Sequence, residues 1–435
     1  MKRVLIITDL IQSSPRFPGI SDYLREEGWD ATIVTPPLDQ KEPIELSEHR
    51  HSGSSIVETT SYKKKRDLLH NIAASLSNKR ELRSPIWKIG RSVYHRIRRI
   101  YELIVDQIYW FPDSDKHWVI PAVTACQTLI EKERFDALLS SSSPVTSHLV
   151  ASILQERTGL PWVADFRDLW TQNHVYRFSG IRRIIERRLE IATLKSAITM
   201  LTVSPTLVED LTQLHRGISV AELRNGFDPR WYQQLRTRVT EKFTITYTGR
   251  IYAGKQNPSL ILCALRDLIS EGVIPEELVH LRFYGPLEIS IDWEAESLGI
   301  GHIVEQYGMI PRSAVAERQR ESQLLLVFNW EDKRARGGII MQKTFDYIGA
   351  RRPILATGGH RGDLREDMLS QGGFGSYCPE LMDVKNALQK WFSQYQELGY
   401  VPFKGCETFV ADCSYPQRAK QLAHHLDLIA GAAPP

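Results

Sequence analysis

The chain has 435 residues, of which 42% are hydrophobic and 25% are charged, an ordinary globular composition with enough length for two or three domains. No run of about 18 apolar residues occurs, which excludes a transmembrane helix. A formal net charge of +3 is too small to indicate nucleic-acid binding.

The N-terminal segment and the cysteines bear on the cellular compartment. The first apolar run is too short for a signal peptide and ends in Thr8-Asp9 without a cleavage site, so a buried strand is expected there. The five cysteines are scattered and no Cys-x-x-Cys occurs, so neither a disulfide framework nor a zinc site is predicted. We expect a cytoplasmic chain without a metal or other cofactor.

Strands and helices alternate through the first half. Strands are predicted at 4–8, 31–35, 135–140, 162–164 and 197–203, and helices at 20–28, 145–158 and 206–215. Residues 38–60 are polar and are predicted to form a loop. The loop at 9–20 lacks Gly-x-Gly-x-x-Gly, so no dinucleotide site is expected there.

Residues 61–110 form a basic stretch that begins at Lys63-Lys64-Lys65-Arg66 and is interleaved with aromatic residues. A second basic segment, 181–189, alternates apolar residues with pairs of arginines. Such patterns are typical of an anionic membrane surface or of nucleic acid, and they also occur on solvated helices with a buried aromatic side. Because no nucleic-acid motif accompanies them, the membrane interpretation is favoured.

Charged residues follow the strand predicted at 162–164. Asp165, Arg167 and Asp168 would lie at the carboxyl end of that strand, where open α/β sheets place active sites. A structural ion pair between loops explains the same residues equally well. His174 follows them in a polar loop and is a weaker acid–base candidate.

The alternation starts again after a polar segment, 229–242, which is predicted to link two domains. Strands are expected at 243–248, 279–284, 303–308, 324–328 and 353–356, with helices at 258–271, 311–321 and 415–430. The pattern predicts the α/β class, with two doubly wound sheets.

Three cations follow strands of the second half: Arg250, Lys255 and Lys343. Converging cations at that position suit a diphosphate, and Asp346, three residues after Lys343 on one helix, is placed to accept hydrogen bonds from ribose hydroxyls. The competing interpretation is a solvated Lys–Asp pair on a helix face. No Walker, Gly-x-Ser-x-Gly or metal-binding spacing occurs.

Several short motifs occur in a characteristic order. In the second half they are Gly249-Arg250, Lys255, Gly285, Gly308, Lys343-Thr-Phe-Asp346-Tyr and Arg352-Pro353-Ile-Leu-Ala. The first half contributes residues 141–148, 161–170, 203–207 and 225–228. Together they resemble the GT-B glycosyltransferases of family 4 over most of the chain, except residues 38–110.

The resemblance implies two Rossmann-like domains that face each other across a cleft. Residues 1–228 would form an acceptor-side domain with a basic helical insert at about 61–110. Residues 240–405 would bind the nucleotide sugar, and residues 406–435 would form a helical tail that packs back on the first domain.

The resemblance also implies roles for single residues. Arg250 and Lys255 would stabilise the departing diphosphate, and Gly249, Gly285, Gly308, Lys343 and Asp346 would complete the donor site. The family's pair of glutamates, eight residues apart, is replaced here by Gly338 and Asp346, which leaves open what meets the sugar hydroxyls. Arg167 and Asp168 stand at the loop where many relatives carry a histidine, and they are the catalytic candidates of the first domain.

The expected activity is that of a retaining glycosyltransferase of the hexosyltransferase class. The expected partners are a nucleotide-diphosphate sugar, a glycan or lipid-linked acceptor and an anionic membrane surface, but no nucleic acid. The chain would act in surface polysaccharide biosynthesis, peripherally on the inner face of the membrane. The alternatives are a sugar-nucleotide epimerase, which needs carboxylates and a histidine at the cleft, and a non-catalytic GT-B assembly partner, which would not need three converging cations.

Overall fold

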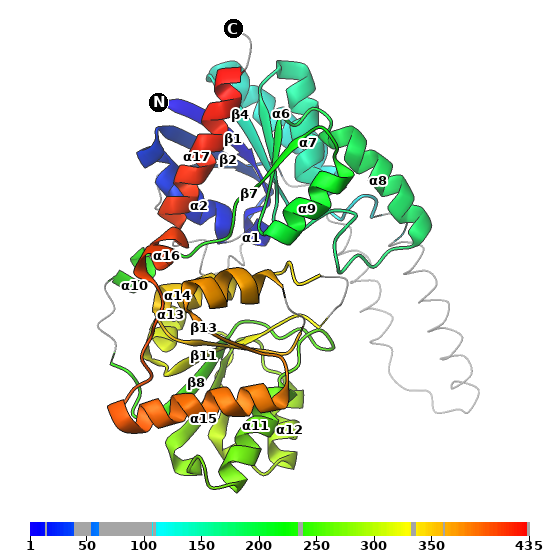
Figure 1. Ribbon diagram of the computed structural model, residues 1–435. Helices are drawn as coiled ribbons and strands as arrows, with labels where there is room; N and C mark the ends of the chain where they lie inside the picture. The colour runs from blue at the N-terminus through cyan, green and yellow to red at the C-terminus, as the bar shows by residue number, and fades with distance from the viewer. Residues whose placement is uncertain are drawn as a thin grey trace, which may run out of the picture.

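The computed structural model describes residues 1–13, 15–38, 54–60, 107, 110–233, 238–331, 336–359 and 362–432. These residues form two α/β domains, drawn one above the other in Figure 1, each built on a parallel sheet. The prediction of two doubly wound sheets is confirmed. Apart from Gln107 and Trp110, the predicted basic insert at 61–110 lies outside the described residues.

The sheet of the N-terminal domain has seven strands in the order β3-β2-β1-β4-β5-β6-β7. Its strands are β1 (Lys2–Ile7), β2 (Trp29–Thr35), β3 (Ser55–Glu58), β4 (Ala137–Ser142), β5 (Trp162–Phe166), β6 (Thr199–Thr202) and β7 (Ser219–Glu222). One face packs against α2 (Arg16–Leu24) and α17 (Tyr415–Ala432). The other face packs against α6 (Val119–Lys132), α7 (Thr146–Thr158) and α9 (Pro205–Leu214).

The sheet of the C-terminal domain has six strands in the order β10-β9-β8-β11-β12-β13. They are β8 (Phe243–Thr248), β9 (Val279–Tyr284), β10 (Val304–Gln306), β11 (Leu324–Phe328), β12 (Ile354–Thr357) and β13 (Gly375–Cys378). One face packs against α11 (Ser259–Ser270), α12 (Ile289–Ser297) and α15 (Leu381–Leu398), and the other against α13 (Arg312–Glu321) and α14 (Gln342–Ala350).

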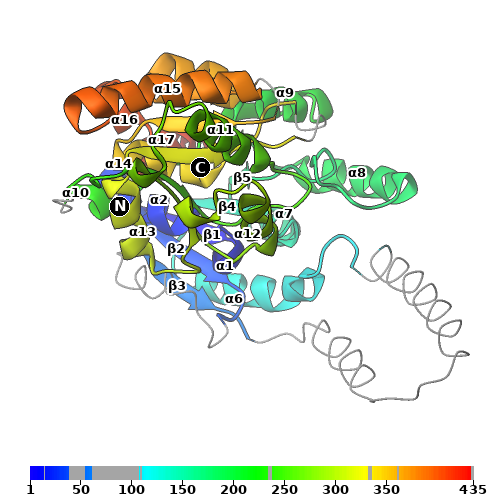
Figure 2. The same ribbon diagram turned by 90° about the horizontal axis from the view of Figure 1, so that it is seen from below.

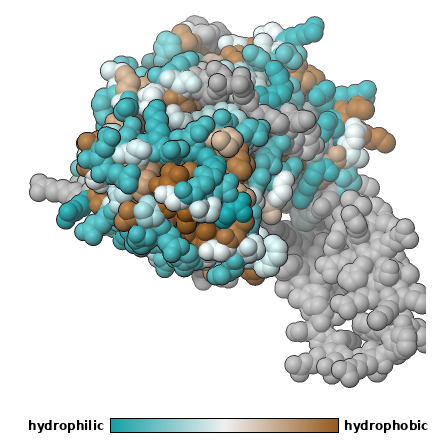
Figure 3. Space-filling model, turned by 60° about the horizontal axis from the view of Figure 1, so that its bottom comes forward, coloured by the Kyte–Doolittle hydropathy of each residue, from teal (hydrophilic) through white to brown (hydrophobic). Residues whose placement is uncertain are grey.

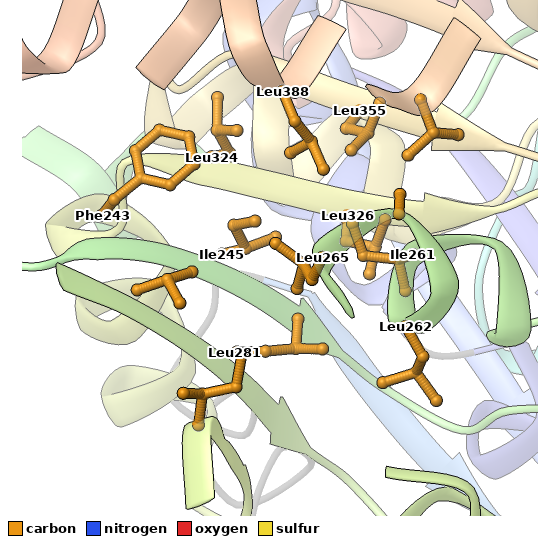
Figure 4. Packing of buried hydrophobic residues seen from close by; sticks show 14 of the residues in the cluster. Phe243, Ile245, Ile261, Leu262, Leu265, Leu281, Leu324, Leu326, Leu355 and Leu388 are labelled. Carbon is orange, nitrogen blue, oxygen red and sulfur yellow. The ribbon is translucent and has the colours of Figure 1, made fainter. Parts of the chain in front are cut away.

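The central strands are continuous apolar runs because helices cover both of their faces. In β11, Leu324 and Leu326 point towards α11 and α15, while Leu325 and Val327 point towards α14. Figure 4 shows the first of these layers, where Leu326 lies between Leu265 of α11 and Leu388 of α15. Alternate side chains of one strand therefore hold two helical layers in place.

Two local predictions need correction or detail. The loop predicted at 38–60 is wrong in part, because Ser55–Glu58 forms the edge strand β3, which pairs in parallel with β2. This strand is short and partly exposed, so it lacks the apolar run by which buried strands are detected. The predicted linker contains a helical turn, α10 (Arg230–Gln233).

The chain crosses between the domains a second time near its C-terminal end. An isolated bridge pairs Phe227 with Ser414, and the Tyr415 amide donates to the Phe227 carbonyl at 2.8 Å. Tyr415 then packs on Gly19 of α2 so closely that a Cβ at residue 19 would lie 2.3 Å from its ring. Helix α17 thereby completes the core of the N-terminal domain, as Figure 1 shows.

Candidate active site

A cavity of about 440 Å³ lies between the two domains. The N-terminal domain contributes polar side chains to its lining, among them Gln12, Arg16, Arg167, Asp168, Gln172 and Asn173. The C-terminal domain contributes Arg250, Tyr252, Trp330 and residues 338–343. Arg250 follows β8 and Trp330 follows β11. The direction of the strand order reverses between these two neighbouring strands. Open α/β sheets bind their ligands at the carboxyl ends of the strands where such a reversal occurs.

Lys343 brings a cation to this cavity from the first turn of α14. Its ammonium lies 3.8 Å from the centroid of the Tyr247 ring and donates a hydrogen bond to the Tyr247 hydroxyl. Among the described residues, no carboxylate forms an ion pair with it, since Asp346 pairs with Arg312 at 2.9 Å instead. Burial lowers the pKa of Lys343 to about 7, against the opposing effect of the Asp346 charge.

Asp346 belongs to a different environment. It is buried between α14 and α13, where it accepts hydrogen bonds from Arg312 and, at 3.4 Å, from Gln342. Burial raises the pKa of Asp346, and the charge of Arg312 acts in the opposite direction. The side chain is not part of the cavity lining, so its predicted role towards a ribose stays a prediction.

The other two predicted cations lie on the loop after β8. Arg250 is exposed and lines the cavity, and its carbonyl accepts a hydrogen bond of 2.7 Å from Tyr247. Lys255 is half-buried and is not among the lining residues, but its carbonyl accepts from the Glu331 amide at 3.0 Å. That bond ties the loop after β8 to the loop after β11, which carries Trp330.

Gly249, Gly285 and Gly308 join the carboxyl ends of three strands. The Gly249 amide donates to the Tyr284 carbonyl at 2.7 Å, and the Gly285 amide donates to the Gly308 carbonyl at 2.9 Å. A Cβ at Gly249, which has a φ of 114°, would lie 3.0 Å from the Lys343 ammonium. The glycine therefore leaves the space that Lys343 occupies, and contact of these glycines with a donor stays a prediction.

The N-terminal wall of the cavity rests on a buried arginine that the sequence patterns did not single out. Arg16 is 1% exposed and pairs with Asp165 at 2.8 Å, and Asp165 also accepts from Ser141 at 2.8 Å. The same guanidinium donates to the Leu223 and Arg224 carbonyls. Asp165 thus forms the structural ion pair that its sequence position allowed, and it is not among the residues that line the cavity.

The two catalytic candidates of this domain are more accessible. Arg167 donates to the Gln12 carbonyl and lies 3.4 Å from the carboxylate of Asp168, whose side chain is 43% exposed. Both line the cavity, opposite Arg250 and Lys343. His174 also lies here, with its ring 5.0 Å from that of Trp330, so an aromatic contact bridges the two domains. Among the described residues, no group of three or more His, Cys, Asp or Glu side chains is arranged to hold a metal ion.

Residues 89–226 match a known family, the glycosyl transferase 4-like domain. This match lies in the N-terminal half of the chain, and the chain as a whole has the GT-B fold. Its fold is similar to those of solved structures over nearly all of its length. The sucrose-phosphate synthase of Thermosynechococcus elongatus has 13% sequence identity and a TM-score of 0.64, with 99% of this chain and 100% of that chain covered.

Two further structures carry UDP. HepE of Anabaena, in complex with UDP, has 12% identity and a TM-score of 0.56, with 99% of this chain and 98% of that chain covered. A mutant of TarM of S. aureus, in complex with UDP, fondaparinux and α-GlcNAc-glycerol, has 8% identity and a TM-score of 0.58, with 98% of this chain and 100% of that chain covered. At these identities the likeness concerns the fold. A comparison with curated protein sequences gave no match.

The GT-B arrangement gives a physical reason for Gly338. The Ser204 hydroxyl at the start of α9 donates to the Gly338 carbonyl at 2.7 Å, and a Cβ at residue 338 would lie 2.9 Å from the Cβ of Thr206. The amide and hydroxyl of Thr206 both donate to Asp363 of the C-terminal domain. A helix of the N-terminal domain therefore occupies the space into which a side chain at residue 338 would project, so the glycine permits contact between domains.

We predict that the protein binds a nucleoside diphosphate more weakly as the pH rises above about 7. Lys343 attracts the anion only when protonated, and its pKa of about 7 places the loss of charge there. Isothermal titration calorimetry with UDP between pH 6.5 and 8.5 avoids most of the second phosphate ionisation, which lies near pH 6. The Lys343→Met variant should bind weakly at every pH, and an identical pH dependence in that variant would contradict the assignment.

The same substitution should raise the melting temperature at neutral pH. The unfolded chain keeps this proton up to about pH 10, whereas the folded chain releases it near pH 7, so protonation favours the unfolded state. Replacing the ammonium with a thioether removes that penalty. Differential scanning calorimetry at pH 6.5 measures the effect, and a lower melting temperature for Lys343→Met would contradict it.

Proposed function

We propose that this chain is a glycosyltransferase that transfers a sugar from a nucleotide-diphosphate sugar to a glycan acceptor, with retention of the anomeric configuration. The observation that carries the proposal is the placement of Arg250 and Lys343 on one wall of the interdomain cavity, opposite a polar wall from the N-terminal domain. The two walls supply a site for an anion and a site for a hydroxyl-bearing acceptor in one cavity.

The electrostatics of the first wall suit a departing diphosphate. As the bond between the sugar and the phosphate oxygen breaks, negative charge accumulates on the diphosphate, and cations that are already in place stabilise that charge. Arg250 can form paired hydrogen bonds to phosphate oxygens, and Lys343 supplies a charge that forms no ion pair with a carboxylate of the described residues. UDP is the first nucleotide to test, because HepE and TarM were solved with it.

The opposite wall suits a carbohydrate. Gln12, Gln172 and Asn173 offer amides, and the exposed carboxylate of Asp168 accepts hydrogen bonds from hydroxyl groups. A structural neighbour, WaaB, is a galactosyltransferase of the lipopolysaccharide outer core, with 11% identity and a TM-score of 0.54. We infer a lipid-linked or membrane-proximal glycan as acceptor and a place in surface polysaccharide biosynthesis.

A membrane-facing role is supported by α8 (Gly180–Leu194), which projects from the side of the N-terminal domain in Figures 1 and 2. Its exposed residues include Ile181, Ile184, Ile185, Ile191, Arg187 and Arg188. Its two carboxylates are buried, Glu186 against Arg182 at 2.6 Å and Glu190 against Thr171 at 2.5 Å. The outward side thus combines isoleucines with cations and carries no acid, as a surface for anionic lipid does.

The C-terminal domain provides an internal contrast. Figure 3 shows apolar residues gathered in the middle of a largely hydrophilic face of the molecule. On α12 of this domain, Ile289 and Trp293 are 83% and 73% exposed, but the helix contains Asp292, Glu294 and Glu296 and no basic residue. An anionic membrane repels such a helix. No helix of the described residues has the length and hydropathy required to cross a bilayer.

The donor assignment predicts that a nucleoside diphosphate raises the melting temperature. Binding to the folded state alone stabilises it by about 2.7 kcal/mol at a hundred times the dissociation constant. Differential scanning fluorimetry with UDP, GDP and ADP tests this directly, and the absence of a shift with all three would contradict the proposal.

The same assay extends to variants. Arg250→Ala should lose the shift and the transferase turnover while it keeps the fold, and the role that the family resemblance implies for Lys255 predicts the same for Lys255→Ala. Lys390→Ala, which removes an exposed cation on α15, is the matched control and should behave as the unmodified protein.

The membrane assignment predicts binding to vesicles of phosphatidylglycerol and phosphatidylcholine that weakens as salt rises. Replacing Ile184 and Ile185 with serine should reduce the affinity at least tenfold, because each loses about 1.5 kcal/mol or more of apolar burial. Ile289→Ser on the acidic helix α12 is the control and should have no effect. Sedimentation with vesicles measures the bound fraction, and binding that is absent or insensitive to salt would contradict the assignment.

A further inference from the structure

One buried hydroxyl connects the two cations of the proposed donor site. Tyr247 lies on β8 and is 1% exposed. Its hydroxyl donates to the Arg250 carbonyl at 2.7 Å and accepts a hydrogen bond from the Lys343 ammonium. Its ring lies under the same ammonium, with 3.8 Å between the nitrogen and the ring centroid. A single side chain therefore contacts both Lys343 and the backbone that carries Arg250.

The position of this side chain is fixed by its surroundings. The Tyr247 ring packs against Phe328 at 4.7 Å and Phe283 at 6.0 Å between ring centroids, so it belongs to the apolar core of the C-terminal domain. The core holds the ring, and the ring presents its hydroxyl at the edge of the cavity. Rigid support of this kind is what a binding group needs in order to meet its ligand without further ordering.

A phenol differs from a carboxylate as a partner for the lysine. Burial raises the pKa of Tyr247 far above its ordinary value, so the hydroxyl stays protonated and neutral. It holds the ammonium in place without cancelling its charge. A carboxylate at the same place would neutralise Lys343 and repel an incoming phosphate.

We propose that Tyr247 is the positioning residue of the donor site, which holds the Lys343 ammonium and the backbone of the Arg250 loop in place for a diphosphate. The inference rests on the proposed function and adds a residue that acts through two others. Other charged or titratable groups act on Lys343 and Tyr247. Asp346, paired with Arg312, acts on Lys343. Tyr347 of α14, Tyr252 and Glu288 act on Tyr247.

The test is Tyr247→Phe, which removes the hydroxyl and keeps the ring. UDP binding at pH 7, measured by isothermal titration calorimetry, should weaken about tenfold, as expected for a lost hydrogen bond to a charged group. The pH above which affinity falls should also move below that of the unmodified protein, because the ammonium loses an acceptor that favours its charged form.

Tyr347→Phe is the matched control. It removes another buried hydroxyl of the same domain, one that accepts from the Thr248 amide at 2.9 Å and contacts neither cation. It should leave both the UDP affinity and its pH dependence unchanged, and melting temperatures show that both variants are folded. In a Lys343→Met background, Tyr247→Phe should have less effect than in the unmodified protein, because the two residues act together.

The outcomes separate the inference from the proposed function. If UDP, GDP and ADP all fail to bind the unmodified protein, the proposed function is wrong and this inference fails with it. If UDP binds the unmodified protein and Tyr247→Phe binds it with the same affinity and the same pH dependence, the inference alone is wrong.

Discussion

The candidate site depends on a partly buried lysine with which no carboxylate of the described residues forms an ion pair. The Lys343 ammonium contacts the ring and hydroxyl of Tyr247, and the nearby Asp346 is engaged by Arg312. Removing an ammonium from water costs free energy, and the contact with a neutral phenol offsets only part of this desolvation cost. The pKa of Lys343 therefore falls to about 7. A folded chain tolerates this cost where an anion is to bind, since the ligand then supplies the missing charge.

The second requirement is that two domains meet around that lysine. Helix α9 of the N-terminal domain contacts the Gly338 backbone, and the Asp363 carboxylate accepts hydrogen bonds from Thr206 at the start of the same helix. The C-terminal helix α17 crosses back onto α2 and completes the N-terminal core. These contacts bring the polar wall with Arg167 and Asp168 opposite Arg250 and Lys343.

The fold could be predicted because it depends on local patterns of apolar residues in the sequence. Short apolar strands such as Leu324–Phe328 and Val279–Tyr284, each followed by an amphipathic segment, predict a parallel sheet covered on both faces. The edge strand β3 escaped prediction because it is half-exposed and has no such run. The structural role of Arg16 was not predicted, because its partners, Asp165 and the carbonyls near residue 224, lie far away in sequence. The need for a glycine at residue 338 could not be predicted either, because the side chain that leaves no space for a Cβ there belongs to Thr206, more than a hundred residues away along the chain.

The site described above requires Arg250 and Lys343 to bind the diphosphate of a donor together. A crystal structure of the protein with UDP should show phosphate oxygens within hydrogen-bond distance of both side chains, at the carboxyl ends of β8 and β11, with Tyr247 still in contact with Lys343. UDP bound away from this cavity, or in it with neither cation in contact, would show that the two cations do not form the donor site.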